Sequence, residues 1–84
     1  MEHYNFLTPE QNDALHYANG YLTAMQRNES HYRDHIDIDT YQSKLYLIID
    51  TIKDSKICPE DRFDAADSLV GIVQELHAET AHLH

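Results

Sequence analysis

The chain is poor in several residue types, and each scarcity excludes a class of structure. Its 84 residues include one cysteine, two glycines, two prolines and no tryptophan. A single thiol cannot build an internal disulfide framework. No Gly or Pro stands between Tyr21 and Cys58, and no low-complexity stretch or long linker divides the chain. We therefore expect one domain over residues 1–84.

Long apolar runs are also missing. No stretch approaches the roughly 18 apolar residues of a membrane span. The first residues, MEHYNFL, combine neither a basic region nor a long apolar run, so we expect no signal peptide. These observations predict a cytoplasmic protein that does not enter a membrane.

Basic residues are strongly outnumbered. Six Lys and Arg face 15 Asp and Glu, which leaves a formal net charge of −9 and a sequence pI of about 4.9. Nucleic acid and anionic membranes attract clustered cations, so neither is expected as a direct ligand. A protein with a basic surface, such as a DNA-binding groove, would instead be attracted.

Motifs for catalysis or cofactor binding are absent as well. Neither a Gly-rich phosphate loop nor a nucleophile with a base placed beside it can be recognised. Cys58, directly before Pro59, is interpreted as an ordinary residue at a helix boundary. The sequence therefore predicts a protein that is not an enzyme and has no cofactor.

Apolar residues recur at helical spacing in three stretches. The most apolar stretch is 39–57, where Tyr41, Leu45 and Ile52 share one face, Asp39 is the expected N-cap and Lys56 lies in the expected last turn. An earlier helix that begins with a capping box is predicted by Thr8, Pro9 and Gln11. The predicted elements are an N-terminal arm over 1–7 and helices over about 9–33, 40–56 and 59–81. The predicted apolar faces of the last two helices also include Ile48, Phe63, Val70, Leu76 and Leu83.

The stretch 28–30, Asn-Glu-Ser, is the alternative end of the first helix. A tight connection between the second and third helices favours antiparallel neighbours. The fold predicted is all-α, either a small antiparallel three-helix bundle or a helical hairpin completed by oligomerisation. Domains of this size are marginally stable alone, so we expect a homo-oligomer.

Tyrosines and one leucine predict exposed binding surfaces on the first two helices. Six tyrosines cannot all be buried in so small a core, and Tyr is enriched at interface hot spots. Tyr17 and Gly20 fall in a row with Asp13 and Ala24, a smooth ridge that another helix could approach closely. On the second helix, Tyr46 lies at the edge of the apolar stripe and Leu47 lies opposite it. The alternative interpretation of Leu47 is an ordinary exposed leucine without a binding role, because single apolar residues are common on protein surfaces.

Acidic residues crowd the start of the third helix, at Glu60, Asp61, Asp64 and Asp67. One interpretation is a solvated face whose acids favour the helix N-terminus. The other is a row of carboxylates that imitates phosphates and occupies a basic groove on a nucleic-acid-handling protein.

Three residues form a candidate metal site. If the segment is helical, His31 and His35 share a face at i, i+4, and Asp34 is a nearby oxygen ligand. The glutamate of a zinc-protease helix and the Gly and Glu of an EF-hand loop are missing.

Two functional hypotheses follow. The first is a non-enzymatic protein-interaction module that binds another protein through acidic and Tyr-rich helix faces. Its size and charge resemble those of phage or mobile-element inhibitors of host proteins, without any motif match. The alternative is a helical protein that binds a metal or a small ligand through His and Asp side chains.

Overall fold

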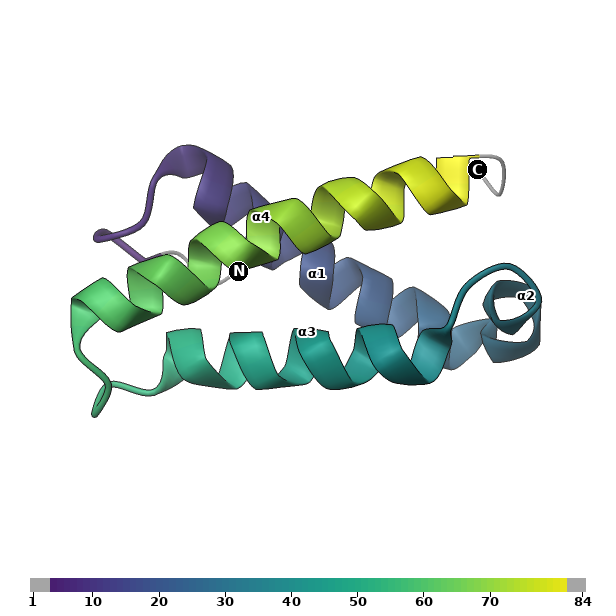
Figure 1. Cartoon of the computed structure of the whole chain (residues 1–84), viewed down its shortest axis with the longest axis horizontal. Helices are drawn as coiled ribbons and strands as arrows, with labels where there is room; N and C mark the ends of the chain where they lie inside the picture. Colours follow the sequence, from purple (N-terminus) through teal and green to yellow (C-terminus); the bar gives the residue numbers. More distant parts are fainter. Residues whose placement is uncertain (1–3, 82–84) are drawn as a thin grey trace.

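The computed structural model describes residues 4–81, and within that range it contains four helices and no strand. The helices are α1 Pro9–Arg27, α2 Glu29–Arg33, α3 Ile38–Lys53 and α4 Pro59–Thr80. In Figure 1, α1 slopes downwards behind α4 to the level of the right-hand end of α3, and α3 runs along the bottom. The prediction of an all-helical protein is confirmed, while completion of the core by oligomerisation stays a prediction.

The first helix begins where local chemistry predicts. The Gln11 N–H donates to Oγ1 of Thr8 at 3.1 Å, and the Thr8 N–H donates to Oε1 of Gln11 at 2.9 Å. Pro9 occupies the first turn, where its missing N–H costs nothing. The predicted capping box is confirmed.

The first helix ends at Arg27 and the chain turns at Asn28, so the alternative end predicted at 28–30 is confirmed and a single uninterrupted helix over 9–33 is not. Asn28 leaves helical geometry with φ −127° and ψ 45°, and its N–H donates to the Ala24 carbonyl at 2.9 Å. The short α2 then redirects the chain. Tyr32 and Ile36 thereby become 6% and 7% exposed, respectively. Burying these two side chains favours the break over a straight continuation.

The start of α3 also differs from the prediction, because Asp37 and not Asp39 is its N-cap. Thr40 donates its N–H to Oδ1 of Asp37 at 3.2 Å and its hydroxyl to Oδ2 at 2.7 Å. The bond from the Thr40 side chain is the main cause of a lowered pKa of the Asp37 carboxyl. The earlier start brings Ile38 into the core at 1% exposure. At the other end α3 stops at Lys53, so Lys56 lies beyond it.

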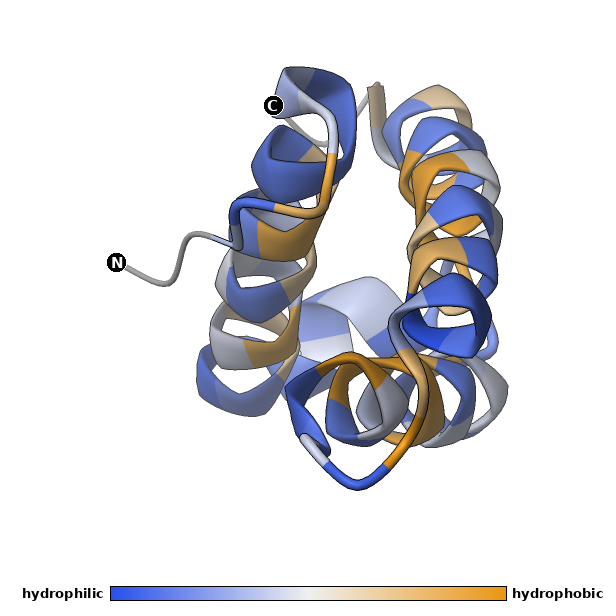
Figure 2. Ribbon diagram, turned by 90° about the vertical axis from the view of Figure 1, so that its left-hand side faces the viewer, coloured by the Kyte–Doolittle hydropathy of each residue, from blue (hydrophilic) through white to orange (hydrophobic). Residues whose placement is uncertain are grey.

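Three long helices stand around one shared interior, as the end-on view of Figure 2 shows. The predicted apolar faces supply the core, although Ile48, Phe63 and Val70 are only partly buried. Leu83, also predicted to belong to the apolar face of the last helix, lies outside the described residues. The largest fully buried apolar side chains are those of Leu15, Met25, Ile38, Leu45, Ile52, Leu69 and Leu76.

The N-terminal arm packs on the helices over its described part, residues 4–7. The Asn12 side chain accepts the Tyr4 N–H at 2.9 Å and donates back to the Tyr4 carbonyl at 3.1 Å. The guanidinium of Arg62 stacks over the ring of Phe6, 4.5 Å from its centroid, and donates to the carbonyl of Ile52 at 2.7 Å. The arm, the end of α3 and the start of α4 are therefore joined by one arginine.

None of the helices described over residues 4–81 has the length and apolar character needed to cross a membrane.

Candidate functional site

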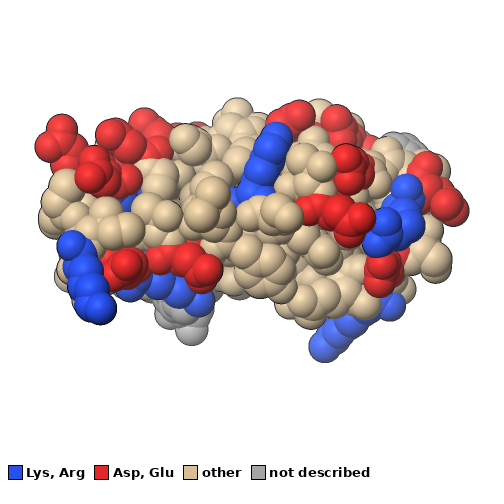
Figure 3. All heavy atoms as spheres, turned by 60° about the horizontal axis from the view of Figure 1, so that its bottom comes forward, with Lys and Arg blue, Asp and Glu red and all other residues tan. Residues whose placement is uncertain are grey.

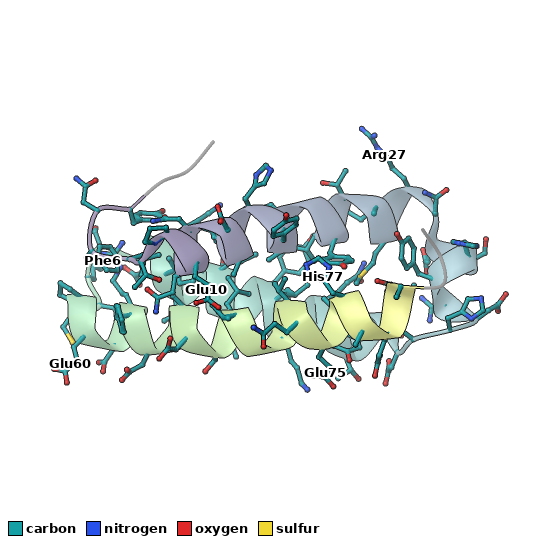
Figure 4. All side chains as sticks on the ribbon, turned by 90° about the horizontal axis from the view of Figure 1, so that it is seen from above. Phe6, Glu10, Arg27, Glu60, Glu75 and His77 are labelled. Atoms are coloured by element: carbon teal, nitrogen blue, oxygen red, sulfur yellow. The ribbon has the colours of Figure 1, made fainter. Side chains whose placement is uncertain are left out.

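The outer side of α1 carries a row of residues that spans almost the whole helix. We call it the α1 ridge, and it consists of Glu10, Asp13, Tyr17, Gly20, Ala24 and Arg27. Ala24 is partly buried and the other five are exposed. Over residues 4–81, the ridge acids and the ridge arginine form no ion pair. Figure 4 shows Glu10 and Arg27 towards opposite ends of α1.

A hollow of about 330 Å³ opens beside the middle of the α1 ridge. Tyr17 is 51% exposed, and its ring meets the imidazole of His77 from α4 edge to face at 5.0 Å. Nδ1 of His77 lies 2.6 Å from the hydroxyl of Tyr21, at hydrogen-bonding distance. Aromatic rings therefore form most of the lining of the hollow, and the small residues Gly20 and Ala24 form the rest. The lining residues are His16, Tyr17, Gly20, Tyr21, Ala24, Tyr32 and His77.

Nothing in the described part of the chain, residues 4–81, requires a glycine at position 20. Its backbone does not have positive φ, and a Cβ added to it would meet nothing within 4 Å. A glycine inside a helix costs about 1 kcal/mol relative to alanine. The same holds for Gly71 in α4, whose Cβ would also point into open space.

The outer side of α4 differs from that of α1 because its charges have one sign. The helix contains six acids and one arginine. That arginine, Arg62, is turned away to the end of α3 and the N-terminal arm. We call five of the acids the α4 acidic ridge: Glu60, Asp61, Asp64, Asp67 and Glu75. In Figure 3, acidic side chains gather along the upper edge, where α4 runs, whereas basic side chains lie apart from one another.

One member of the α4 acidic ridge has a structural role that the sequence did not reveal. Oδ1 of Asp67 accepts a hydrogen bond from Nε2 of Gln11 at 3.0 Å. Gln11 is 2% exposed, and its Oε1 already caps α1. Asp67 therefore ties α4 to the start of α1, while Glu60, Asp61 and Asp64 have no ion-pair partner among residues 4–81.

The sixth acid of α4, Glu79, also has an internal partner. The hydroxyl of Tyr41, a residue of α3 that is 7% exposed, donates to Oε2 of Glu79 at 3.1 Å. Burial of the phenol is the main cause of a raised pKa of Tyr41, and the carboxylates of Glu79 and Glu75 raise the pKa further. This bond ties the C-terminal part of α4 to α3.

The candidate residues of α3 lie on a separate surface. Leu47 is 70% exposed, in line with its predicted position opposite the apolar stripe. Tyr46 is 44% exposed, and its hydroxyl accepts a hydrogen bond from Nε2 of Gln26 in α1 at 2.8 Å. Part of Tyr46 is therefore committed to joining α1 and α3.

The candidate metal ligands come close together without forming a complete set. His31 belongs to α2 and His35 to the turn after it, and their ring centroids are 6.0 Å apart. Arg33 binds the carboxylates of Glu29 and Asp39. Across residues 4–81, no group of three or more His, Cys, Asp or Glu side chains is arranged to hold a metal ion.

Sequence reasoning missed His77 as a wall of the hollow and missed the two charged ends of the α1 ridge. His77 and Tyr21 are 56 positions apart, so no local signal could pair them. Glu10 and Arg27 could have been found, because they continue the alternating three- and four-residue spacing of Asp13, Tyr17 and Ala24.

Comparisons of this chain with protein-family models, with curated proteins and with solved structures find no match.

Proposed function

We propose that this protein is a non-catalytic interaction module that binds a basic surface of another protein through the α4 acidic ridge. The observation that carries the proposal is the separation of charge on α4. Glu60, Asp61 and Asp64 are exposed, and the one arginine of the helix is directed away from them. Carboxylates left without cations nearby create a negative field, which speeds the approach of a positively charged partner.

The spacing of these acids suits a partner groove that normally holds a phosphate backbone. Glu60 and Asp64 are one helical turn apart, and Asp67 and Glu75 extend the row along the same side. An inhibitor that occupies the basic groove of a host nucleic-acid-handling protein would use such a row, and this is the form of the proposal that we favour. The net charge of −9 supports it, because unspecific contact with nucleic acid is disfavoured.

The test compares two double charge reversals. In the first, Asp61→Lys and Asp64→Lys change the ridge and spare Asp67, which supports the fold. In the matched control, Asp34→Lys and Asp50→Lys change two exposed acids outside α4. Both variants move the formal charge from −9 to −5, since each reversal adds two charges. A difference between them therefore reports the place of the charge and not its total.

The probe is a synthetic peptide rich in Lys and Arg, titrated at low and high salt. The ridge variant should lose most of the salt-dependent binding, and the control variant should keep it. Equal loss in both variants would mean that only net charge matters, and the proposal would be abandoned. Circular dichroism of both variants checks that they fold.

A further inference from the structure

The spacing of the α1 ridge is that of a helix seam that meets a second helix. Its members alternate by three and four residues, an average of about 3.5, which keeps a row facing a neighbouring helix in a left-handed supercoil. At about 1.5 Å per residue, the ridge from Glu10 to Arg27 is about 26 Å long. Among residues 4–81 no other helix of the same chain covers it, as the exposure of five of its six members shows.

The order of residues along the α1 ridge is complementary to itself in reverse. The midpoint lies between Ala18 and Asn19. About that point, large Tyr17 is the counterpart of Gly20, and Glu10 is the counterpart of Arg27. A second α1 placed antiparallel would therefore bring the bulky Tyr17 of each copy against Gly20 of the other. It would also bring the acidic Glu10 of each copy against the basic Arg27 of the other.

We propose that the occupant of the α1 ridge is a second copy of this chain, bound antiparallel about a two-fold axis. In this dimer the ring of Tyr17 from each copy enters the hollow beside Gly20 of the other. Arg27 of each copy lies beside Glu10 of the other, with Asp13 one turn away. Self-complementary surfaces of this kind form closed dimers and not filaments.

The surroundings of the ridge agree with this occupant. A second hollow of about 480 Å³ shares Gly20 and Ala24 with the first and reaches Arg27, the end at which Glu10 of the second copy would lie. At the opposite end, the groove beside Glu10 and Tyr17 is lined on the α4 side by uncharged Gln74 and by His77, not by acids of the α4 acidic ridge. No Lys or Arg lines this groove, so none competes there with Arg27 of the second copy for Glu10.

The first test measures the dimerisation constant of the whole protein by sedimentation equilibrium. Protein concentrations run from about 10 μM to 1 mM, because a contact limited to one pair of helices is expected to have a dissociation constant in this range. We compare the wild type with Arg27→Glu, with Glu10→Arg and with the double variant. Each single change places two like charges together at both ends of the interface. Each should weaken dimerisation about tenfold, and the double variant should return near the wild-type value.

Net charge alone predicts a different pattern. Arg27→Glu takes the formal charge from −9 to −11, and Glu10→Arg takes it from −9 to −7. If general repulsion controlled association, Glu10→Arg would strengthen the dimer. That result, or a wild type that stays monomeric over the whole concentration range, would overturn the proposal.

The second test uses the two glycines as a matched pair. A Cβ added at either position meets nothing within 4 Å, so we expect Gly20→Leu and Gly71→Leu both to fold, with higher helix propensity. Only Gly20→Leu fills the hollow that Tyr17 of the second copy needs, and it should abolish the dimer. Gly71→Leu should leave dimerisation unchanged. Equal dimerisation by both variants would refute the proposal that the α1 ridge is the dimer interface.

This inference goes beyond the proposed partner binding and can fail separately from it. The Asp61→Lys and Asp64→Lys variant should keep the dimer while losing the basic peptide. The Gly20→Leu variant should lose the dimer while keeping the peptide.

Discussion

The outer sides of α1 and α4 are built from similar parts but differ in charge order. Each is a solvent-facing side of a long helix with a glycine near its middle whose Cβ would meet open space. The α1 ridge has acids at one end and an arginine at the other, whereas the α4 acidic ridge has acids alone. Mixed order is self-complementary, while a single sign repels its own copy and attracts a basic surface.

The difference teaches that the position of each cation decides which charge pattern a helix face presents to solvent. Arg27 stays on the surface of α1 at the end of the ridge. Arg62 begins on α4 but is held at the end of α3 by the carbonyl of Ile52 and by the ring of Phe6. Removing one arginine from the surface of α4 leaves a helix of uncompensated acids.

The largest expected effect comes from breaking the core on which both ridges rest. Leu76 is fully buried, so Leu76→Ala should lower the free energy of unfolding by about 2–5 kcal/mol. Leu47→Ala removes the same side chain from a position that is 70% exposed and should change stability by less than about 0.5 kcal/mol. Urea unfolding followed by circular dichroism measures both. Similar losses in the two variants would contradict the burial of Leu76.

The next effect separates the acid of α4 that has a structural role from the acids that we propose bind a partner. Gln11→Ala removes both the reciprocal cap of α1 and the bond to Asp67. It should lower the free energy of unfolding by about 1–3 kcal/mol. Asp64→Asn, which touches neither bond, serves as the control and should be nearly neutral in urea unfolding. If Gln11→Ala were equally neutral, the bond between Gln11 of α1 and Asp67 of α4 would contribute no stability.

A smaller effect concerns the tie between α3 and the end of α4. Tyr41→Phe removes the bond to Glu79 and should cost about 0.5–1.5 kcal/mol at neutral pH. Because the pKa of Tyr41 is raised on folding, its contribution is complete below the ordinary tyrosine pKa of about 10 and is lost as the pH rises through the folded value. Unfolding at a series of alkaline pH values measures this loss, which should be smaller in Tyr41→Phe. An unchanged alkaline profile would contradict the assignment.

The smallest effect compares the glycines directly. Gly20→Ala and Gly71→Ala should each raise the free energy of unfolding by about 0.5–1 kcal/mol in dilute solution, because the added Cβ meets nothing and alanine favours the helix. Thermal melting at micromolar concentration measures both gains. A loss of stability at either glycine would indicate a contact within the chain.

Much of the fold could be predicted because its signals are local. Thr8, Pro9 and Gln11 specify the start of α1 within four residues, and the helical period places Leu45 and Leu76 in the core. The break at Asn28 was predicted only as an alternative to a longer helix, and the early start of α3 was not predicted. Both depend on the burial of Tyr32, Ile36 and Ile38 against other helices. Tertiary packing there overrides local preference.

For the candidate surfaces, the exposure of residues could be predicted from the sequence, whereas their bonds to other helices could not. Exposure of Tyr17, Gly20 and Leu47 follows from the helical period alone, and so does the row of acids on α4. The internal bond of Asp67 and the use of Tyr46 by Gln26 were missed, because they join residues from different helices. A residue can be placed on a face from the sequence, but its bonding partner cannot.

The sequence by itself determined that this chain forms helices, where α1 and α4 begin, which faces are apolar and that the surface is strongly acidic. These properties depend on spacing and capping within a few residues and on composition. Tertiary structure alone decided the direction of Arg62, the bond between Gln11 and Asp67, and the aromatic hollow between Tyr17 and His77. The reason is distance along the chain: residues 56 positions apart meet only when the helices have packed.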